Sequence, residues 1–452
     1  MALVKHEMRL KVDKSREFCL HCDGGFNELK SEDITYKEIW ILNGFTRLRL
    51  HHQKKRCRCG QTTVRAKTPQ DLSLGSSLFS HSFFAEVVTS RLLDAIPVSR
   101  LSNRLKRYEY HIPRQTLNQM LHKVGDVIKP IADRIRYLIK IQRFIQADGT
   151  HMPIYNELKC IKSPLWVNVA PEIGLCAYHN VKSEKSEDLM ILMSNREGIC
   201  MTDAQSSILN LTKVGKSAEK AWGEEPLRES VLCWAHMRRN FYKLLGTHTK
   251  FCKKVLKYIR KIYSVEWSCI LDEVSNEEKL KRRQKTSAKY VKRLYKLLSK
   301  KQKTILPKSN LSKAIQYAID SLKEVKEAES LAQDTQRWSS FCEFLKDPVI
   351  PLDNNLSERL LRVISRWRDS SLWAYNEKSL DSFSDLLTVL QSCELRNVNP
   401  LKWLTQILPH AYDLPKEPKS DQIDLLLPGI FELQKKDQIG VKFEQTSIFS
   451  TQ

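Results

Sequence analysis

The chain has no long apolar run and little glycine, and each shortage excludes a class of protein. No apolar stretch reaches the roughly 18 residues that a membrane-spanning helix needs, and residues 1–14 lack the apolar core of a secretory signal peptide. Only 14 of 452 residues are glycine, which favours helix. The hydrophobic content of 41% is too high for a chain disordered throughout. We therefore expect a cytoplasmic protein without a membrane anchor, whose cysteines are reduced.

Acidic residues are also scarce relative to basic ones. The sequence contains 52 Asp and Glu against 75 Lys and Arg, which gives a formal net charge of +23. Such an excess indicates a polyanionic partner and carries no information about the fold. A nucleic acid is the partner that this charge favours over an ordinary basic enzyme.

Most of the 12 cysteines stand singly in apolar runs and are predicted to be small buried hydrophobes. These single cysteines include Cys176, Cys200, Cys269 and Cys393.

Four other cysteines form two close pairs, Cys19 with Cys22 and Cys57 with Cys59. Between the pairs, residues 34–51 alternate in polarity like a β-hairpin with Asn43-Gly44 at its turn. A hairpin would bring the paired thiolates together, which predicts a tetrahedral zinc site. The alternatives are a metal-free cysteine cluster or a ligand exchanged for one of three nearby histidines. Those histidines are His21, His51 and His52.

Residues 98–124 predict two helices joined by a short turn. The first amphipathic helix runs to about Arg107, the turn ends at Pro113, and the second helix starts near Arg114, since proline suits a helix start. With Arg114, Gln115 and Asn118 leading the second helix, the segment resembles a helix-turn-helix that reads DNA. A plain helical hairpin with a solvated charged face is the alternative.

The remainder of the chain predicts a mixed α/β core. Strand-like runs and helices follow one another over residues 143–245, and two of the runs close on acids, Asp148 and Asp203. This pattern favours a ribonuclease-H-like catalytic core interrupted by a basic helical insertion. The predicted domains are a zinc-finger-like module at 1–70, a helical DNA-binding region at 75–142, the first part of the core at 143–245, the insertion at 246–345, the second part of the core at 346–410 and a tail at 411–452.

Residues 351–362 place Glu358 on the first turns of a probable helix, with Asp353 in position to cap it. Four arginines follow, Arg359, Arg362, Arg366 and Arg368. A single carboxylate among so many cations suits a divalent metal beside a nucleic-acid backbone, where the arginines would bind phosphates.

Several motifs in one order resemble the transposases of bacterial insertion-sequence family 66. Q-A-D-G-T at 146–150 and M-T-D at 201–203 are similar to the first two catalytic motifs of that family. V-L-C-W-A-H-M-R-R-N-F at 231–241 and I-P-L-D-N-N-L-S-E-R-L-L-R at 350–362 are similar to its later signatures, and the paired cysteines to its zinc-finger-like segment. The signature at 350–362 is the most specific of these.

The resemblance implies a DDE transposase on a ribonuclease-H-like fold, active in the bacterial cytoplasm at the nucleoid. Asp148, Asp203 and Glu358 would hold Mg²⁺ or Mn²⁺ for cutting and joining DNA. Cys233 and His236 are similar to a C-x-x-H motif of other transposases that carry insertions. The alternative for this pair is a strand end with a hydrogen-bonded histidine.

The implied partner is duplex DNA, namely the terminal repeats of the element and the target. Action as a homo-oligomer on DNA, and a need for companion proteins of the same element, stay open. Gly149 stands where the family usually has glutamate. A decayed or repurposed relative that only binds DNA is therefore the alternative function.

Overall fold

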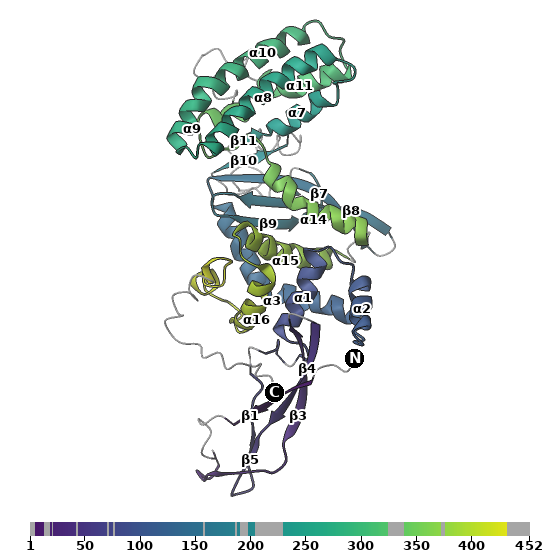
Figure 1. Ribbon diagram of the computed structural model, residues 1–452, viewed down its shortest axis with the longest axis vertical. Helices are drawn as coiled ribbons and strands as arrows, with labels where there is room; N and C mark the ends of the chain where they lie inside the picture. The colour runs from purple at the N-terminus through teal and green to yellow at the C-terminus, as the bar shows by residue number, and fades with distance from the viewer. Residues whose placement is uncertain are drawn as a thin grey trace.

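The structure is a computed structural model, and the molecule is elongated (Figure 1). Small β-sheets form one end, the helical insertion forms the other, and a larger sheet lies between them. The residues described are 5–12, 19, 21–41, 44–69, 72–75, 77–156, 159–185, 188–189, 198–203, 229–323, 339–371 and 376–431.

Two three-stranded sheets form the N-terminal end. One has the order β1-β4-β3 and the other the order β2-β5-β6. The predicted hairpin is confirmed as β3 and β4, but Gly44 pairs with Ile41 as the first residue of β4 rather than standing in the turn. The strands are β1 (Lys5–Leu10), β2 (Phe26–Glu28), β3 (Asp33–Ile41), β4 (Gly44–His52), β5 (Lys54–Cys57) and β6 (Thr63–Arg65).

Three helices follow, α1 (His81–Leu92), α2 (Val98–Arg107) and α3 (Arg114–Lys140). The starts of both helices of the helix-turn-helix segment and the end of the first are confirmed, and Pro97 and Pro113 occupy the N-cap positions of α2 and α3. The second helix runs beyond the predicted segment, which ended at residue 124, and continues to Lys140. The helix α3 is much longer than a recognition helix requires. Its later turns pack against β9 and α15.

The central sheet has five strands in the order β11-β10-β7-β8-β9. β7, β8 and β9 form an antiparallel meander, whereas β10 and β11 run parallel to β7. The prediction that the first strand closes at Asp148 is wrong, because β7 continues to Asn156 in a long pairing with β8. The strands are β7 (Phe144–Asn156), β8 (Lys159–Ala170), β9 (Leu175–Asn180), β10 (Ile199–Thr202) and β11 (Glu229–Leu232).

The segment between β11 and residue 345 is helical wherever it is described, apart from short connections. Its helices share an apolar core with the side chains of Phe144 and Met201, which reach it from the sheet. The elements are α7 (Trp234–Tyr242), α8 (Thr249–Leu271), α9 (Asn276–Arg282), a π-helical turn η2 (Arg283–Ser287), α10 (Ala288–Gln302), α11 (Asn310–Lys323), α13 (Ser339–Cys342) and a 3-10 turn η3 (Glu343–Leu345).

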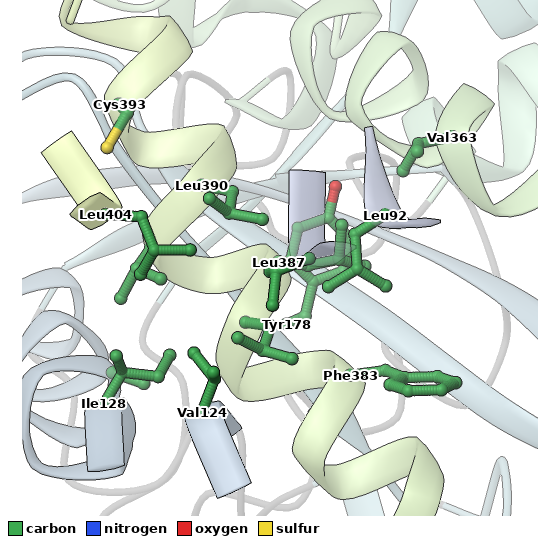
Figure 2. Packing of buried hydrophobic residues seen from close by; sticks show 14 of the residues in the cluster. Leu92, Val124, Ile128, Tyr178, Val363, Phe383, Leu387, Leu390, Cys393 and Leu404 are labelled. Atoms are coloured by element: carbon green, nitrogen blue, oxygen red, sulfur yellow. The ribbon is translucent and has the colours of Figure 1, made fainter. Parts of the chain in front are cut away.

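The last helices are α14 (Asn355–Ser371), α15 (Glu377–Leu395), α16 (Pro400–Tyr412) and α17 (Ser420–Asp424). Buried α15 is the centre of the larger core: it packs against α3, α16 and β9 (Figure 2). The thiols of Cys176, Cys200, Cys269 and Cys393 are buried, as predicted. Among the described helices, none combines the length and apolarity needed to cross a bilayer.

Candidate active site

Strand register places Asp148 and Asp203 side by side. Met201 of β10 pairs with Gln146 of β7, and the two strands are parallel. Asp203 lies two residues after Met201, and Asp148 lies two residues after Gln146. Because side chains alternate between the faces of a sheet, Asp148 shares the face of Phe144, which turns toward the core of the helical insertion. The two carboxylates therefore stand on neighbouring strands at the boundary between sheet and insertion.

The surroundings of Asp148 shift the pKa of its carboxyl group. Burial raises the pKa of its carboxyl to about 7, and the negative charges of Asp203 and Glu358 contribute to the rise. A hydrogen bond of 2.9 Å from the Gly149 N–H and the positive charge of Arg239 act in the opposite direction. The charges of Asp203 and Glu358 thus act on Asp148, but the three carboxylates do not form a metal-holding group of the kind that the described cysteines form.

Glu358 reaches the site from the first turn of α14, which lies across β7 and β8 (Figure 1). The Asp353 carboxylate accepts a hydrogen bond from the Asn355 N–H at 3.3 Å, so it caps the helix as expected. The Gln146 side chain donates to the Asp353 carbonyl at 3.3 Å. This bond fastens the start of α14 to the strand that carries Asp148.

The helix α7 supplies two further side chains. It begins at Trp234, earlier than predicted, and its first turns present His236 and Arg239 to Glu358. Arg239 Nη2 lies 3.2 Å from Glu358 Oε2, and His236 Nε2 lies 3.6 Å from Glu358 Oε1. Cys233 is buried at the N-cap, where burial raises the pKa of its thiol to about 12. Of the C-x-x-H pair, only His236 therefore contacts the carboxylate site directly.

The four paired cysteines gather into one cluster at the other end of the molecule. Their sulfurs all lie within 4.8 Å of one another, with 3.3 Å between Cys22 and Cys57 and 3.9 Å between Cys19 and Cys59. Tetrahedral zinc with Zn–S bonds of ~2.3 Å separates sulfurs by ~3.8 Å, so the cluster is compatible with structural zinc. A hydrogen bond with Thr62 lowers the pKa of Cys19 to about 6, which favours the thiolate that binds metal.

The histidines offered as alternative zinc ligands have other partners where the structure shows their rings. His52 Nδ1 lies 2.8 Å from the Ala66 carbonyl, and His51 Nδ1 lies 3.1 Å from a Glu32 carboxylate oxygen. Within the described residues, these four cysteines are the only group of three or more Cys, His, Asp or Glu side chains whose ligand atoms lie close enough together to hold one metal ion.

The family model for the transposase IS66 family matches residues 76–381, about two thirds of the chain and all three carboxylates. The chain belongs to this family. Similar proteins include three uncharacterized proteins of Sinorhizobium fredii. Protein y4qI is 26% identical over 83% of this chain and 66% of its own length, y4jD is 23% identical over 97% and 82%, and y4hP is 22% identical over 88% and 71%. The chain thus spans just under two thirds of y4qI.

Exposed cations follow Glu358 along α14. Arg359, Arg362 and Arg366 are exposed on one face of α14, three and four residues apart. Arg366 differs from the other two because its charge acts on the nearby carboxylates of Asp94 and Glu394. Arg359 and Arg362 stand closest in sequence to Glu358.

The leading side chains of α3 are also exposed. Arg114, Gln115 and Asn118 face solvent, while Leu117 is buried against α2. The Ser102 hydroxyl of α2 donates to the Ile112 carbonyl at 2.7 Å, which ties the turn to the first helix. The geometry leaves the predicted recognition residues accessible.

The departure at Gly149 has a packing reason. Gly149 pairs with Trp166 across the β7–β8 ladder, and a Cβ at position 149 would come within 2.6 Å of the indole ring. The indole therefore occupies the space that a glutamate side chain would need. Gly149 thus leaves room for the Trp166 indole that packs over it.

Two residues near the site were not singled out from sequence, Arg239 and Gln146. Arg239 follows His236 by three residues, so both project from one face of α7. Placing the start of α7 at Trp234 would have revealed this relation. Gln146 stands two residues before Asp148 and therefore on the same face of β7, a period-2 signal present in the sequence.

Proposed function

We propose that this protein cuts DNA at the ends of an insertion sequence and joins those ends to a target, with Asp148, Asp203 and Glu358 as its catalytic carboxylates. The observation that carries the proposal is the strand register that sets Asp203 beside Asp148. It is supported by the pKa of Asp148, which burial raises first and the charges of Asp203 and Glu358 raise further. Family membership adds the reaction class.

The chemistry of these side chains suits divalent cations. All three supply hard oxygen donors, which Mg²⁺ and Mn²⁺ prefer, and their combined charge is what a cation relieves. The chemistry that such cations supply is activation of water, and later of the freed 3′ hydroxyl, for in-line attack on a phosphate. Asp148, Asp203 and Glu358 would hold them.

The remaining contributions come from protein groups that place the DNA. Arg359 and Arg362, exposed on α14, would bind phosphates that flank the scissile bond. Arg114, Gln115 and Asn118 would read the terminal repeat in the major groove. The zinc module would be a folding unit, because metal binding at such sites contributes folding free energy.

The sheet order supports a ribonuclease-H-like core. An antiparallel meander of three strands is followed by two strands parallel to the first, with acids on the first strand and after the fourth. We assign the core to that fold, with the insertion placed between β11 and the helix of Glu358. The predicted domain boundaries stay proposals on the same basis.

A DNA-binding protein without catalytic activity is the alternative, and it was motivated by Gly149. The packing of Trp166 against Gly149 gives that glycine a structural reason that does not require loss of activity. The presence of all three acids in one site favours the enzyme.

The test is strand cleavage of terminal-repeat DNA in Mg²⁺ by the wild type and by Asp148→Asn, Asp203→Asn and Glu358→Gln. Each variant should lose cleavage and keep DNA binding, because binding rests on the basic surface. Asp369→Asn is the matched control: it removes an exposed carboxylate from the same helix as Glu358. Full cleavage by any of the three variants, or a wild type that binds the repeats without cutting them, would refute the proposal.

A further inference from the structure

We propose that Arg239 is an exchangeable counter-charge of the carboxylate site: it holds Glu358 while the site is free of metal and moves to a DNA phosphate when a divalent cation takes that carboxylate. This inference rests on the proposed function. It adds a residue that would link metal binding to DNA binding, a role that differs from holding the metal itself.

The contact geometry puts Arg239 in direct competition with a cation. Its Nη2 atom lies 3.4 Å from Oε1 and 3.2 Å from Oε2 of Glu358, so one guanidinium nitrogen spans both carboxylate oxygens. Its charge also acts on Asp148. A cation held by Glu358 and Asp148 would need the same oxygens and would repel the guanidinium.

The helix that carries Arg239 is fixed, whereas the head of the side chain is free to move. The Trp234 indole donates to the Phe341 carbonyl at 2.7 Å, and the Trp234 N–H donates to the Leu352 carbonyl at 2.9 Å. Met237 and Phe241 are buried on the inner face of the helix. The Arg239 side chain is 49% exposed, in contrast, and its guanidinium contacts only side chains at the site, Glu358 and, at 3.3 Å, His236 Nε2, in the bonds that the described residues show.

The Arg239 guanidinium, once released from Glu358, would bind a DNA phosphate. Arginine binds phosphate through two parallel N–H bonds, and the scissile strand must pass beside Glu358 for the proposed reaction. The metal would then free Arg239 for the DNA, and the DNA would remove Arg239 from the metal ligands. By linkage, each ligand should tighten the binding of the other.

A purely structural role for Arg239 makes the opposite prediction. If Arg239 only holds Glu358 in place for the metal, its loss would loosen the carboxylate and weaken metal binding. The direction of the change therefore decides between the two roles.

The experiment measures Mn²⁺ binding by electron paramagnetic resonance, with the full chain loaded with zinc. It compares the wild type, Arg239→Gln, Arg239→Lys and the control Arg238→Gln, with and without a short DNA duplex. A buffer at about pH 8.5 keeps Asp148 ionised, because its pKa is about 7. Arg238→Gln removes the same charge from the adjacent, exposed position of α7.

Without DNA, Arg239→Gln should bind Mn²⁺ about twofold to fivefold more tightly than the wild type, the scale of a lost charge pair. Arg239→Lys and Arg238→Gln should stay near the wild type. Duplex DNA should tighten Mn²⁺ binding in the wild type by a larger factor than in Arg239→Gln. Equal or weaker Mn²⁺ binding by Arg239→Gln, or an equal effect of DNA in both proteins, would overturn the inference.

A parallel measurement on Asp148→Asn separates this inference from the proposed function. If Asp148→Asn keeps wild-type Mn²⁺ binding, the metal is not held at the carboxylates and the proposed function fails with the inference. If Asp148→Asn loses Mn²⁺ binding while Arg239→Gln shows no gain, only the inference fails.

Discussion

Replacing Asp148 by asparagine should stabilise the metal-free protein at neutral and alkaline pH while abolishing cleavage. The asparagine amide has nearly the shape of the carboxyl group, and its oxygen can still accept the hydrogen bond from the Gly149 N–H. The charge that Asp203 and Glu358 repel is removed. A loss of activity accompanied by a gain in stability is the result expected of a site that holds a cation.

The size of the gain follows from the pKa of Asp148. Burial and neighbouring charge raise it from 3.8 to about 7. At ~1.4 kcal/mol per unit, the ionised carboxylate destabilises the folded state by roughly 4 kcal/mol above pH 7. The amide must itself be desolvated, which lowers the expected gain to roughly 2–4 kcal/mol.

The pH dependence gives this prediction its specificity. Because the folded pKa lies above the unfolded one, the folded wild type binds the proton more tightly, and its stability falls as pH rises from about 4 to about 7. The asparagine variant lacks this titration. The stability difference should therefore be small near pH 4, grow through this window and stay constant above it.

Calorimetric unfolding without added divalent cation, with the zinc retained, would measure the difference at about pH 5 and about pH 8. We expect the transition of the catalytic part to rise by roughly 5–10 °C in Asp148→Asn at the higher pH, and by less at the lower pH. Asp369→Asn should show neither effect. Mg²⁺ should stabilise the wild type and leave Asp148→Asn almost unchanged. A gain of equal size at both pH values, or none at pH 8, would refute the electrostatic reasoning.

Other predictions concern the cysteines, the arginines and the glycine. Cys22→Ser should reduce bound zinc to well under one per chain, whereas a full equivalent by metal analysis would contradict the zinc site. Changing Arg359 and Arg362 together to Gln should lower the salt dependence of DNA affinity by about two phosphate contacts, and an unchanged slope in binding titrations would exclude those contacts. Gly149→Ala should destabilise the protein by ~1–3 kcal/mol through the clash with Trp166, and denaturant unfolding that shows no loss would mean that the indole moves aside.

Local signals made the helix bounds of the DNA-binding segment predictable. Pro97 and Pro113 mark the starts of α2 and α3, and buried leucines recur at helical spacing. The end of β7 was not predictable in the same way, because Gly149 and Pro153 weaken strand propensity there. The pairing with β8 that keeps these residues in the strand is a tertiary interaction, which local propensity does not encode.

The residues of the candidate site were predictable where their type and motif indicate their chemistry. They were not predictable where their role depends on contacts between distant parts of the chain. Asp148, Asp203 and Glu358 stand in recognisable motifs. Arg239 was missed because the start of α7 depends on contacts that are distant in the sequence. That start is set by bonds from Trp234 to the carbonyls of Phe341 and Leu352, more than a hundred residues away in the chain.

The helical insertion is more than a segment that loops out between Asp203 and Glu358. Buried Arg283 binds the Glu266 carboxylate through two nitrogens and donates to the carbonyls of Phe344 and Asp347. The Tyr263 hydroxyl of α8 donates to the Asp353 carboxylate at 2.9 Å, and this is the group that caps the helix of Glu358.

These bonds run from the insertion into the segment that leads back to the sheet. Burying a guanidinium stabilises the fold only when its donors are satisfied, and here the acceptors include the backbone of that returning segment. The position of Glu358 relative to Asp148 therefore depends on the packed insertion. The basic helical insertion is thereby connected, through Tyr263 and Asp353, to the start of the helix that carries Glu358.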